Sequence, residues 1–182
     1  MAGIPEAPPT EAPTAREPTA TQFVVVDASN VAFSTSMKGG KASYKVLCKI
    51  IDQLIRANLP HAVIADASLR HRIDEKLAYE GLISRRVILQ APAGRSADQF
   101  IRLLAEARKA KGQQVYVLTN DLLRQFPELA VSRIAYLAIN EEEILFDPPL
   151  ESVAPQRHSQ DVALSEFHAS SNEACLSTGG LH

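Results

Sequence analysis

The most constraining feature of this chain is a run of three β-branched residues, Val24, Val25 and Val26, that ends at Asp27. Continuous runs of this kind are typical of strands that are buried on both faces in the middle of a parallel sheet. A carboxylate at the end of such a strand is costly to bury unless a cation or hydrogen bonds compensate for the lost water. Asp27 therefore either caps the turn or helix that follows it, or belongs to a functional site.

A strand-like run followed by an acid occurs three more times. The runs are residues 62–65, 87–89 and 115–118, and the acids that follow them are Asp66, Asp98 and Asp121. Asp98 comes after a loop and opens a predicted helix behind Ser96, which is a good N-cap residue. A single acid can be explained as a cap, but four at corresponding points favour a shared site.

Segments with helical spacing lie between these runs. They span residues 43–58, 73–82 and 97–111, with a short helix at 122–126. Residues 33–41 are expected to form a loop, and residues 132–139 and 143–146 a strand with its hairpin partner. Alternating strands and helices predict an α/β fold with a mainly parallel sheet of about five strands, covered on both faces. Because crossovers are right-handed, we expect the four acids at the carboxyl edge of that sheet.

The length of 182 residues fits one domain with two tails. Residues 1–22 are rich in Pro, Thr and Ala and predict a disordered arm, residues 23–150 form the domain, and residues 151–182 predict a flexible polar tail. The arm lacks the basic start and apolar stretch of a secretory signal, and no apolar run approaches the roughly 18 residues of a membrane span. The two cysteines have no disulfide or metal-ligand pattern, so a cytoplasmic location is expected.

The charge of the chain is unevenly distributed. Residues 23–150 contain 17 Lys and Arg against 14 Asp and Glu, whereas the tails contain 2 against 7. If four acids of the domain lie in one pocket, the rest of its surface is basic. A basic surface around an acidic cleft suits a polyanion that is bound through metal ions. An ordinary solvated surface gives a similar excess, so composition alone leaves both explanations open.

Several other kinds of site lack necessary parts. A dinucleotide site needs Gly-x-Gly-x-x-Gly after the first strand, which residues 27–30 lack, and a phosphate-binding P-loop is also absent. An aspartyl-phosphate phosphatase usually has a second Asp two residues after its nucleophile, where this chain has Ser29. The five histidines are too scattered for a zinc site. Clustered aspartates suit Mg²⁺ or Mn²⁺, which relieves their repulsion and activates a water for phosphodiester hydrolysis.

Residues 24–32 (VVVDASNVA) resemble the V-V-I-D-G-S-N-V-A signature of NYN-type PIN-like ribonucleases, particularly the Regnase group. Residues 96–101 (SADQFI) resemble the acidic segment before a helix in that group, residues 119–121 (TND) its S-N-D segment, and residues 147–150 (DPPL) its closing segment. The resemblance spans residues 23–150. It implies a PIN-like three-layer α/β/α fold and metal-dependent, most often endonucleolytic, cleavage of RNA.

The resemblance also implies roles for individual residues. The implied metal ligands are Asp27, Asp98 and Asp121. Asn30 becomes a catalytic residue of the pocket that holds a ligand carboxylate or the scissile phosphate. The Regnase group has two adjacent acids before the helix, whereas this chain has Ala97 there and no zinc finger after the domain. Asp66 could replace the missing acid as a further metal ligand.

Single-stranded or looped RNA is the expected partner. The residues expected to contact it are Ser29, Asn30, Asn120, Arg70, Arg72, Arg95, Lys38 and Lys41. Each basic residue alone is more often an ordinary surface charge, but as a group they form a plausible phosphate track. Phe33 is the best placed aromatic for stacking on a base, so we expect weak sequence readout. PIN-like domains often pair, so the resemblance also implies that a homodimer could form.

Three alternatives to a metal-dependent ribonuclease stay open. A catalytically weak PIN-like RNA-binding or regulatory module is favoured by Ala97 and opposed by the acids that are present. A nuclease toxin controlled by a partner protein fits the size of the domain. A receiver-like phosphoacceptor domain needs paired acids after the first strand and a late lysine, and neither is evident.

Overall fold

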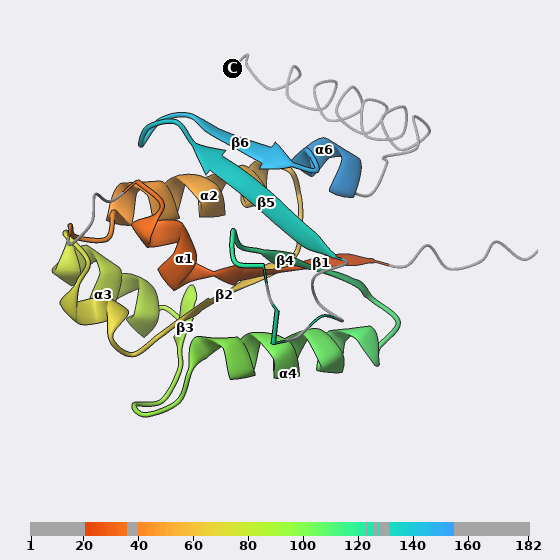
Figure 1. The fold of residues 1–182 in the computed structure, drawn as a ribbon, viewed down its shortest axis with the longest axis horizontal. Helices are drawn as coiled ribbons and strands as arrows, with labels where there is room; N and C mark the ends of the chain where they lie inside the picture. Colours follow the sequence, from red (N-terminus) through yellow and green to blue (C-terminus); the bar gives the residue numbers. More distant parts are fainter. Residues whose placement is uncertain (1–20, 36–39, 123, 126, 128–131, 155–182) are drawn as a thin grey trace, which may run out of the picture.

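The computed structural model describes residues 21–35, 40–122, 124–125, 127 and 132–154. Its centre is a six-stranded sheet in the order β3-β2-β1-β4-β5-β6 (Figure 1). The strands are β1 Gln22–Asp27, β2 His61–Ala65, β3 Ile88–Gln90, β4 Gln114–Leu118, β5 Arg133–Ala138 and β6 Ile144–Asp147. The first five in spatial order are parallel, and β6 is antiparallel to β5. The predicted mainly parallel α/β sheet with a hairpin is therefore confirmed.

Helices cover both faces of this sheet (Figure 1). The helices α1 Ala28–Phe33, α2 Tyr44–Arg56 and α3 Lys76–Ser84 lie on one face, and α4 Ala97–Lys109 lies on the other. Val24 and Val26 of β1 pack in the larger core on the first face, whereas Val25 packs with Ile101 of α4. The central strand is thus buried on both faces, as the valine run predicts. No helix in the described part of the chain combines the length and apolarity needed to cross a bilayer.

Two short helices were not predicted. The helix α1 begins directly after β1, where we expected a turn. Its six residues are too few to show helical periodicity in the sequence. In the structure the side chain of Asp27 caps this helix. The helix α6 Leu150–Val153 buries two apolar side chains, so folded structure continues past the expected boundary at residue 150. The predicted helix at 122–126 lies partly outside the described residues, as do the predicted arm and tail, and residues 124–125 form a turn.

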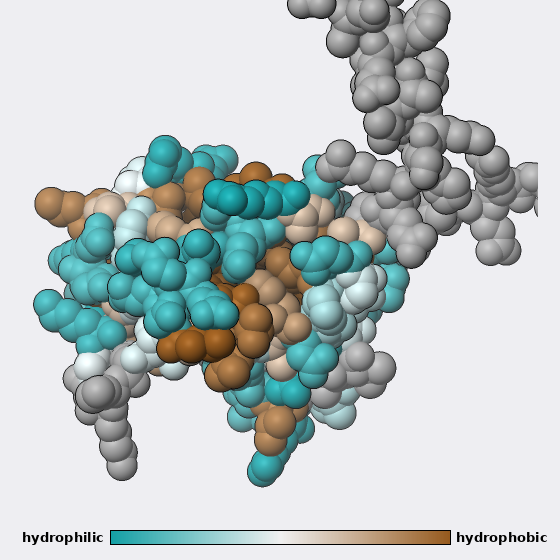
Figure 2. Space-filling model, turned by 90° about the horizontal axis from the view of Figure 1, so that it is seen from above, coloured by the Kyte–Doolittle hydropathy of each residue, from teal (hydrophilic) through white to brown (hydrophobic). Residues whose placement is uncertain are grey.

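The β5–β6 hairpin extends beyond the end of β4. The strand β5 pairs with β4 as far as Ile134, and its later residues pair with β6. Tyr136 and Ile144 face the larger core, whereas Leu137 and Leu145 lie opposite each other and are exposed. Figure 2 shows the upper face of the molecule, where apolar surface is surrounded by hydrophilic residues. Because β5 continues past the end of β4, the β5–β6 hairpin lies beside the carboxyl edge of the sheet, and we refer to it below as the wall.

Candidate active site

A polar pocket of about 490 Å³ lies at this carboxyl edge. The residues that line it are Asp27, Ser29, Asn30, Phe33, Ser34, Asp66, Ser68, Arg72, Asp98, Asn120, Tyr136, Leu137 and Ala138. A larger hollow of about 710 Å³ lies beside α2 and α6, but Glu151 is the one acid among its described lining residues. Three of the four aspartates expected at the site line this smaller pocket, which is therefore the candidate active site.

Asp27 is the last residue of β1 and is only 9% exposed. Its Oδ1 accepts a hydrogen bond of 3.0 Å from the Asn30 amide, and its Oδ2 accepts one of 3.4 Å from the Thr119 hydroxyl. Burial, followed by the charges of Asp98 and Asp66, raises the pKa of Asp27 to about 6, although the two hydrogen bonds oppose this shift. Asp27 is thus a helix cap, and it is also a carboxylate that is held in an electrostatically unfavourable place.

Asp66 directly follows β2 and lies beside the start of α4. Its amide donates a hydrogen bond of 3.3 Å to the Ser29 hydroxyl, and its Oδ1 accepts one of 2.8 Å from the amide of Ala97. The carboxylate therefore satisfies one of the free N–H groups at the beginning of α4. In this position it joins three segments that are distant in sequence and brings its charge into the pocket.

Asp98 lies in the first turn of α4, behind the N-cap residue Ser96, whose hydroxyl accepts a hydrogen bond of 3.2 Å from the Asp98 amide. Burial and the charges of Asp66 and Asp121 raise the pKa of Asp98. The Asp121 side chain is exposed and does not line the pocket, but its amide donates a hydrogen bond of 3.1 Å to the Thr119 hydroxyl. Asp27 and Asp98 therefore each have other aspartates near enough to raise their pKa values.

The side chain of Asn30, which also lines the pocket, is held by two donors to its carbonyl oxygen. The Asn120 amide donates a hydrogen bond of 2.8 Å to Asn30 Oδ1, and the Tyr136 hydroxyl donates one of 2.7 Å to the same atom. The side chain of Asn120 in turn pairs with the backbone of Tyr136 through hydrogen bonds of 2.8 and 3.0 Å. Burial and the charge of Asp27 raise the pKa of Tyr136, so its hydroxyl stays protonated and able to donate.

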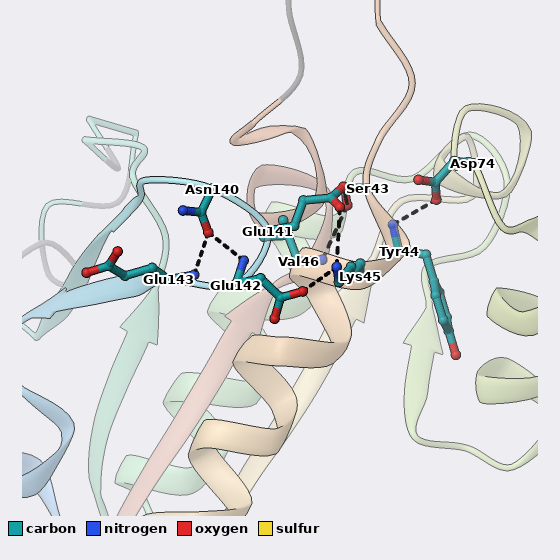
Figure 3. A network of polar contacts seen from close by, with 9 residues as sticks. All are labelled: Ser43, Tyr44, Lys45, Val46, Asp74, Asn140, Glu141, Glu142 and Glu143. Atoms are coloured by element: carbon teal, nitrogen blue, oxygen red, sulfur yellow. Dashed lines mark hydrogen bonds and ion pairs between the residues drawn. The ribbon is translucent and has the colours of Figure 1, made fainter.

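The hairpin that provides Tyr136 is fastened to the beginning of α2 (Figure 3). The hydroxyl of Ser43, the N-cap residue of α2, donates a hydrogen bond of 2.8 Å to Glu141 Oε1 in the hairpin turn. Lys45 forms ion pairs with Glu141, at 3.8 Å, and with Glu142. These contacts hold the turn of the hairpin against α2, and the hydrogen bond from Tyr136 to Asn30 holds β5 against α1.

Several residues of the site were missed in the sequence. Tyr136 belongs to a strand-like run, where nothing local distinguishes a tyrosine that reaches into a pocket from one that packs in the core. Thr119 was included in the TND motif, but no role was predicted for its side chain. Arg133 Nη1 donates to the carbonyl oxygens of Asn120 and Asp121, at 3.5 and 3.3 Å. The position of β5 next to β4 could have suggested these residues, because parallel strands bring their carboxyl ends to the same edge.

The basic residues that are expected to contact RNA differ in their surroundings. Arg72 lines the pocket, and its guanidinium carbon lies 4.2 Å from the centre of the Phe33 ring. Arg70 instead pairs with Glu80 of α3 at 2.9 Å. Lys41 and Arg95 are exposed and do not line the described part of the pocket, and Lys38 lies outside the described residues. Ser29, Asn30 and Asn120 line the pocket, as expected of substrate-binding residues.

The donor set of the pocket fits a hard divalent cation. Among the described residues no three His, Cys, Asp or Glu side chains are arranged as a ready-made metal cluster. Mg²⁺, however, commonly uses one or two carboxylates, keeps several waters and completes its shell with substrate phosphate oxygens. Asp27, Asp66 and Asp98 line the pocket and offer oxygen ligands. Burial, and after it the charges of neighbouring aspartates, raises the pKa values of Asp27 and Asp98, and a bound cation would favour their charged forms.

The fold and the pocket define a class of α/β domain in which aspartates gather at the carboxyl edge of a parallel sheet. Comparison with family models matches residues 20–145 to the Zc3h12a-like ribonuclease NYN domain. This match covers more than half of the chain, so the protein belongs to that family, and the resemblance to NYN ribonucleases is confirmed. Comparison with curated proteins gives no match.

Proposed function

We propose that this protein is a divalent-metal-dependent ribonuclease that hydrolyses phosphodiester bonds within single-stranded or looped RNA. Membership of the NYN ribonuclease family supports the reaction class. The observation that carries the proposal is that Asp27, Asp66 and Asp98 line the same pocket as Asn30. Pairing of two chains and a cytoplasmic location stay predictions.

Mg²⁺ or Mn²⁺ would be held by Asp27 and Asp98, with Asp66 and Asp121 adding charge or further ligands. When bound, such an ion neutralises the charge of the phosphate and lowers the pKa of a water at the site. The same four residues repel an RNA backbone in the absence of the ion, because all of them are carboxylates. The requirement for a metal therefore follows from the charge of the pocket as well as from the chemistry.

Asn30 would bind the scissile phosphate through its amide nitrogen. Both hydrogen bonds that fix this side chain are accepted by Oδ1, from Asn120 and Tyr136. The NH₂ group is the remaining polar group of the amide and can donate to a phosphate oxygen. Fixing the carbonyl side thus presents the donor side in one orientation, which lowers the cost of positioning the substrate.

A cleavage assay with a panel of RNA and DNA oligonucleotides tests the proposal. We expect cleavage of single-stranded RNA with Mg²⁺ or Mn²⁺, and no cleavage in excess chelator. Asp27→Asn and Asp98→Asn should abolish the activity without unfolding the protein, whereas Asp52→Asn, which removes an acid on α2 paired with Arg56, serves as the matched control. Full activity of the Asp27→Asn variant or in chelator would rule the mechanism out.

A catalytically weak RNA-binding module is the second candidate, and one observation favours it. The residue before Asp98 is Ala97, which is 2% exposed and packs in the core under α4, so the second adjacent acid of the Regnase group has no equivalent here. Metal titration by calorimetry combined with the cleavage assay separates the two functions. A module of this kind would bind the oligonucleotide and the metal but leave the RNA intact.

A further inference from the structure

Arg72 stands out among the basic residues of the pocket because its position is fixed. Its guanidinium lies over the ring of Phe33, the last residue of α1, with 4.2 Å between the guanidinium carbon and the ring centre. Its backbone is held on both sides, since its amide donates to the Leu69 carbonyl and its carbonyl accepts from the Ala42 amide, both at 2.9 Å. Cation–π contact of this kind orients a side chain that is otherwise mobile.

The charge of Arg72 is not paired with a protein carboxylate in the described part of the chain. Arg70, two residues earlier, shows the contrast, because it forms an ion pair with Glu80 at 2.9 Å. Asp27, Asp66 and Asp98 line the same pocket as Arg72, yet none of the described acids is within ion-pair distance of it. A fixed, unneutralised guanidinium at the wall of an acid-lined pocket suits an anionic ligand that enters with its own negative charge.

We infer that Arg72, held over the ring of Phe33, binds the phosphate of the nucleotide next to the scissile bond and so places the RNA strand over the aspartates. This assignment rests on the proposed ribonuclease function and names the residue that anchors its substrate. The planar guanidinium can donate two parallel hydrogen bonds to a phosphodiester, which an ammonium cannot do. Phe33 is then a positioning residue, and its ring serves the arginine rather than an RNA base.

Binding of a non-cleavable oligonucleotide tests this role independently of catalysis. A single-stranded 2′-O-methyl RNA is titrated at several NaCl concentrations and one fixed Mg²⁺ concentration, and a gel checks that it stays intact. The proteins are the full chain and the variants Arg72→Gln, Arg72→Lys and Arg56→Gln. Loss of one phosphate contact should reduce the slope of log K against log salt concentration by about 0.7 in Arg72→Gln. Arg56→Gln removes the same charge beside the other hollow, outside the aspartate-lined pocket, and should leave the slope unchanged.

The conservative variants distinguish a positioned phosphate contact from simple charge. Arg72→Lys should keep the salt slope but bind more weakly, because the charge remains and the fork geometry is lost. Phe33→Leu should weaken binding at an unchanged slope, and Phe33→Tyr, which keeps an aromatic ring, should restore it. Thermal unfolding of each variant shows whether it is folded. If Arg72→Gln or Phe33→Leu is unfolded, the binding of Arg72→Lys and Phe33→Tyr still tests the role of Arg72. Inorganic phosphate is the second probe, and it should compete with the oligonucleotide only weakly.

An unchanged salt slope in Arg72→Gln, an equal loss in Arg56→Gln, or absence of oligonucleotide binding by the wild-type chain would overturn this role for Arg72. The outcomes also separate it from the proposed function. Binding that depends on Arg72, without any metal-dependent cleavage, would contradict the proposed ribonuclease function but support phosphate binding by Arg72. Metal-dependent cleavage whose KM and kcat are both unchanged in Arg72→Gln would support the ribonuclease function but contradict the role of Arg72.

Discussion

The hydroxyl of Tyr136 and the side-chain oxygen of Asn30 lie 2.7 Å apart, although the two residues are separated by 106 positions in the chain. This hydrogen bond joins the β5–β6 hairpin to α1 across the pocket. It is reinforced by Asn120, whose amide donates to the same oxygen at 2.8 Å. The orientation of the Asn30 amide is therefore set by residues that themselves would not touch the reacting atoms.

Removing this hydroxyl should impair catalysis more than folding. In Tyr136→Phe the ring still fills the core, so we expect a loss of about 1 kcal/mol in the free energy of unfolding, a typical value for one hydrogen bond. A freely rotating Asn30 amide should lower kcat by about tenfold, with KM little changed. Steady-state kinetics and denaturant unfolding measure both. Tyr116→Phe is the control, since Tyr116 Oη accepts a hydrogen bond from Gln114 away from the pocket, and equal kinetics in the two variants would contradict the prediction.

The raised pKa of Asp27 predicts an unusual dependence of stability on pH. The folded protein binds this proton more tightly than the unfolded chain, because the pKa is about 6 when folded and 3.8 ordinarily. Metal-free protein should therefore lose stability as the pH rises from about 4 to about 6, by at most roughly 3 kcal/mol. Asp27→Asn should remove this part of the pH dependence and be more stable than the wild type near neutrality. Denaturant unfolding at several pH values, with chelator, compares the two proteins.

The cap that Asp27 provides can be separated from its charge. Asn also accepts a hydrogen bond from the third residue of a helix, so Asp27→Asn should keep the start of α1. Asp27→Ala loses both the charge and the cap, and we expect it to be about 1 kcal/mol less stable than Asp27→Asn. Both variants should be equally inactive. An alanine variant as stable as the asparagine variant would show that the cap contributes little.

Divalent ions should stabilise the fold as well as support the reaction. A cation that binds the folded protein and relieves repulsion among the aspartates raises the unfolding temperature with concentration. We expect this increase with Mg²⁺ and Mn²⁺ for the wild type, and a much smaller one for Asp27→Asn or Asp98→Asn. Thermal scans with added Na⁺ at matched ionic strength control for general salt effects. An equal response of wild type and variants would place the cation elsewhere.

The sheet and the acids could be predicted because their signals are local. The runs of Val24–Val26 and of residues 115–118 predict buried strands, and the edge rule for parallel strands places Asp27 and Asp66 at the pocket, although Asp121 does not line it. The partners of those acids could not be predicted, because they depend on which segments meet in space. One example is the ion pair between Arg70, in the short helix η1 Leu69–His71, and Glu80 in α3. The link from Tyr136 to Asn30 is equally invisible along the chain.

The attachment of the hairpin to α2 means that dissolved salt acts on this protein in two ways. Lys45, Glu141 and Glu142 are about half exposed or more, so their attraction is screened as ionic strength rises. Salt that weakens attraction between RNA and Arg72 would also weaken the ion pairs that hold the outer end of the hairpin carrying Tyr136. Activity measured at one ionic strength therefore reports substrate capture and wall rigidity together. Comparing matched variants across a salt series cancels the shared contribution and leaves the contacts of the RNA itself.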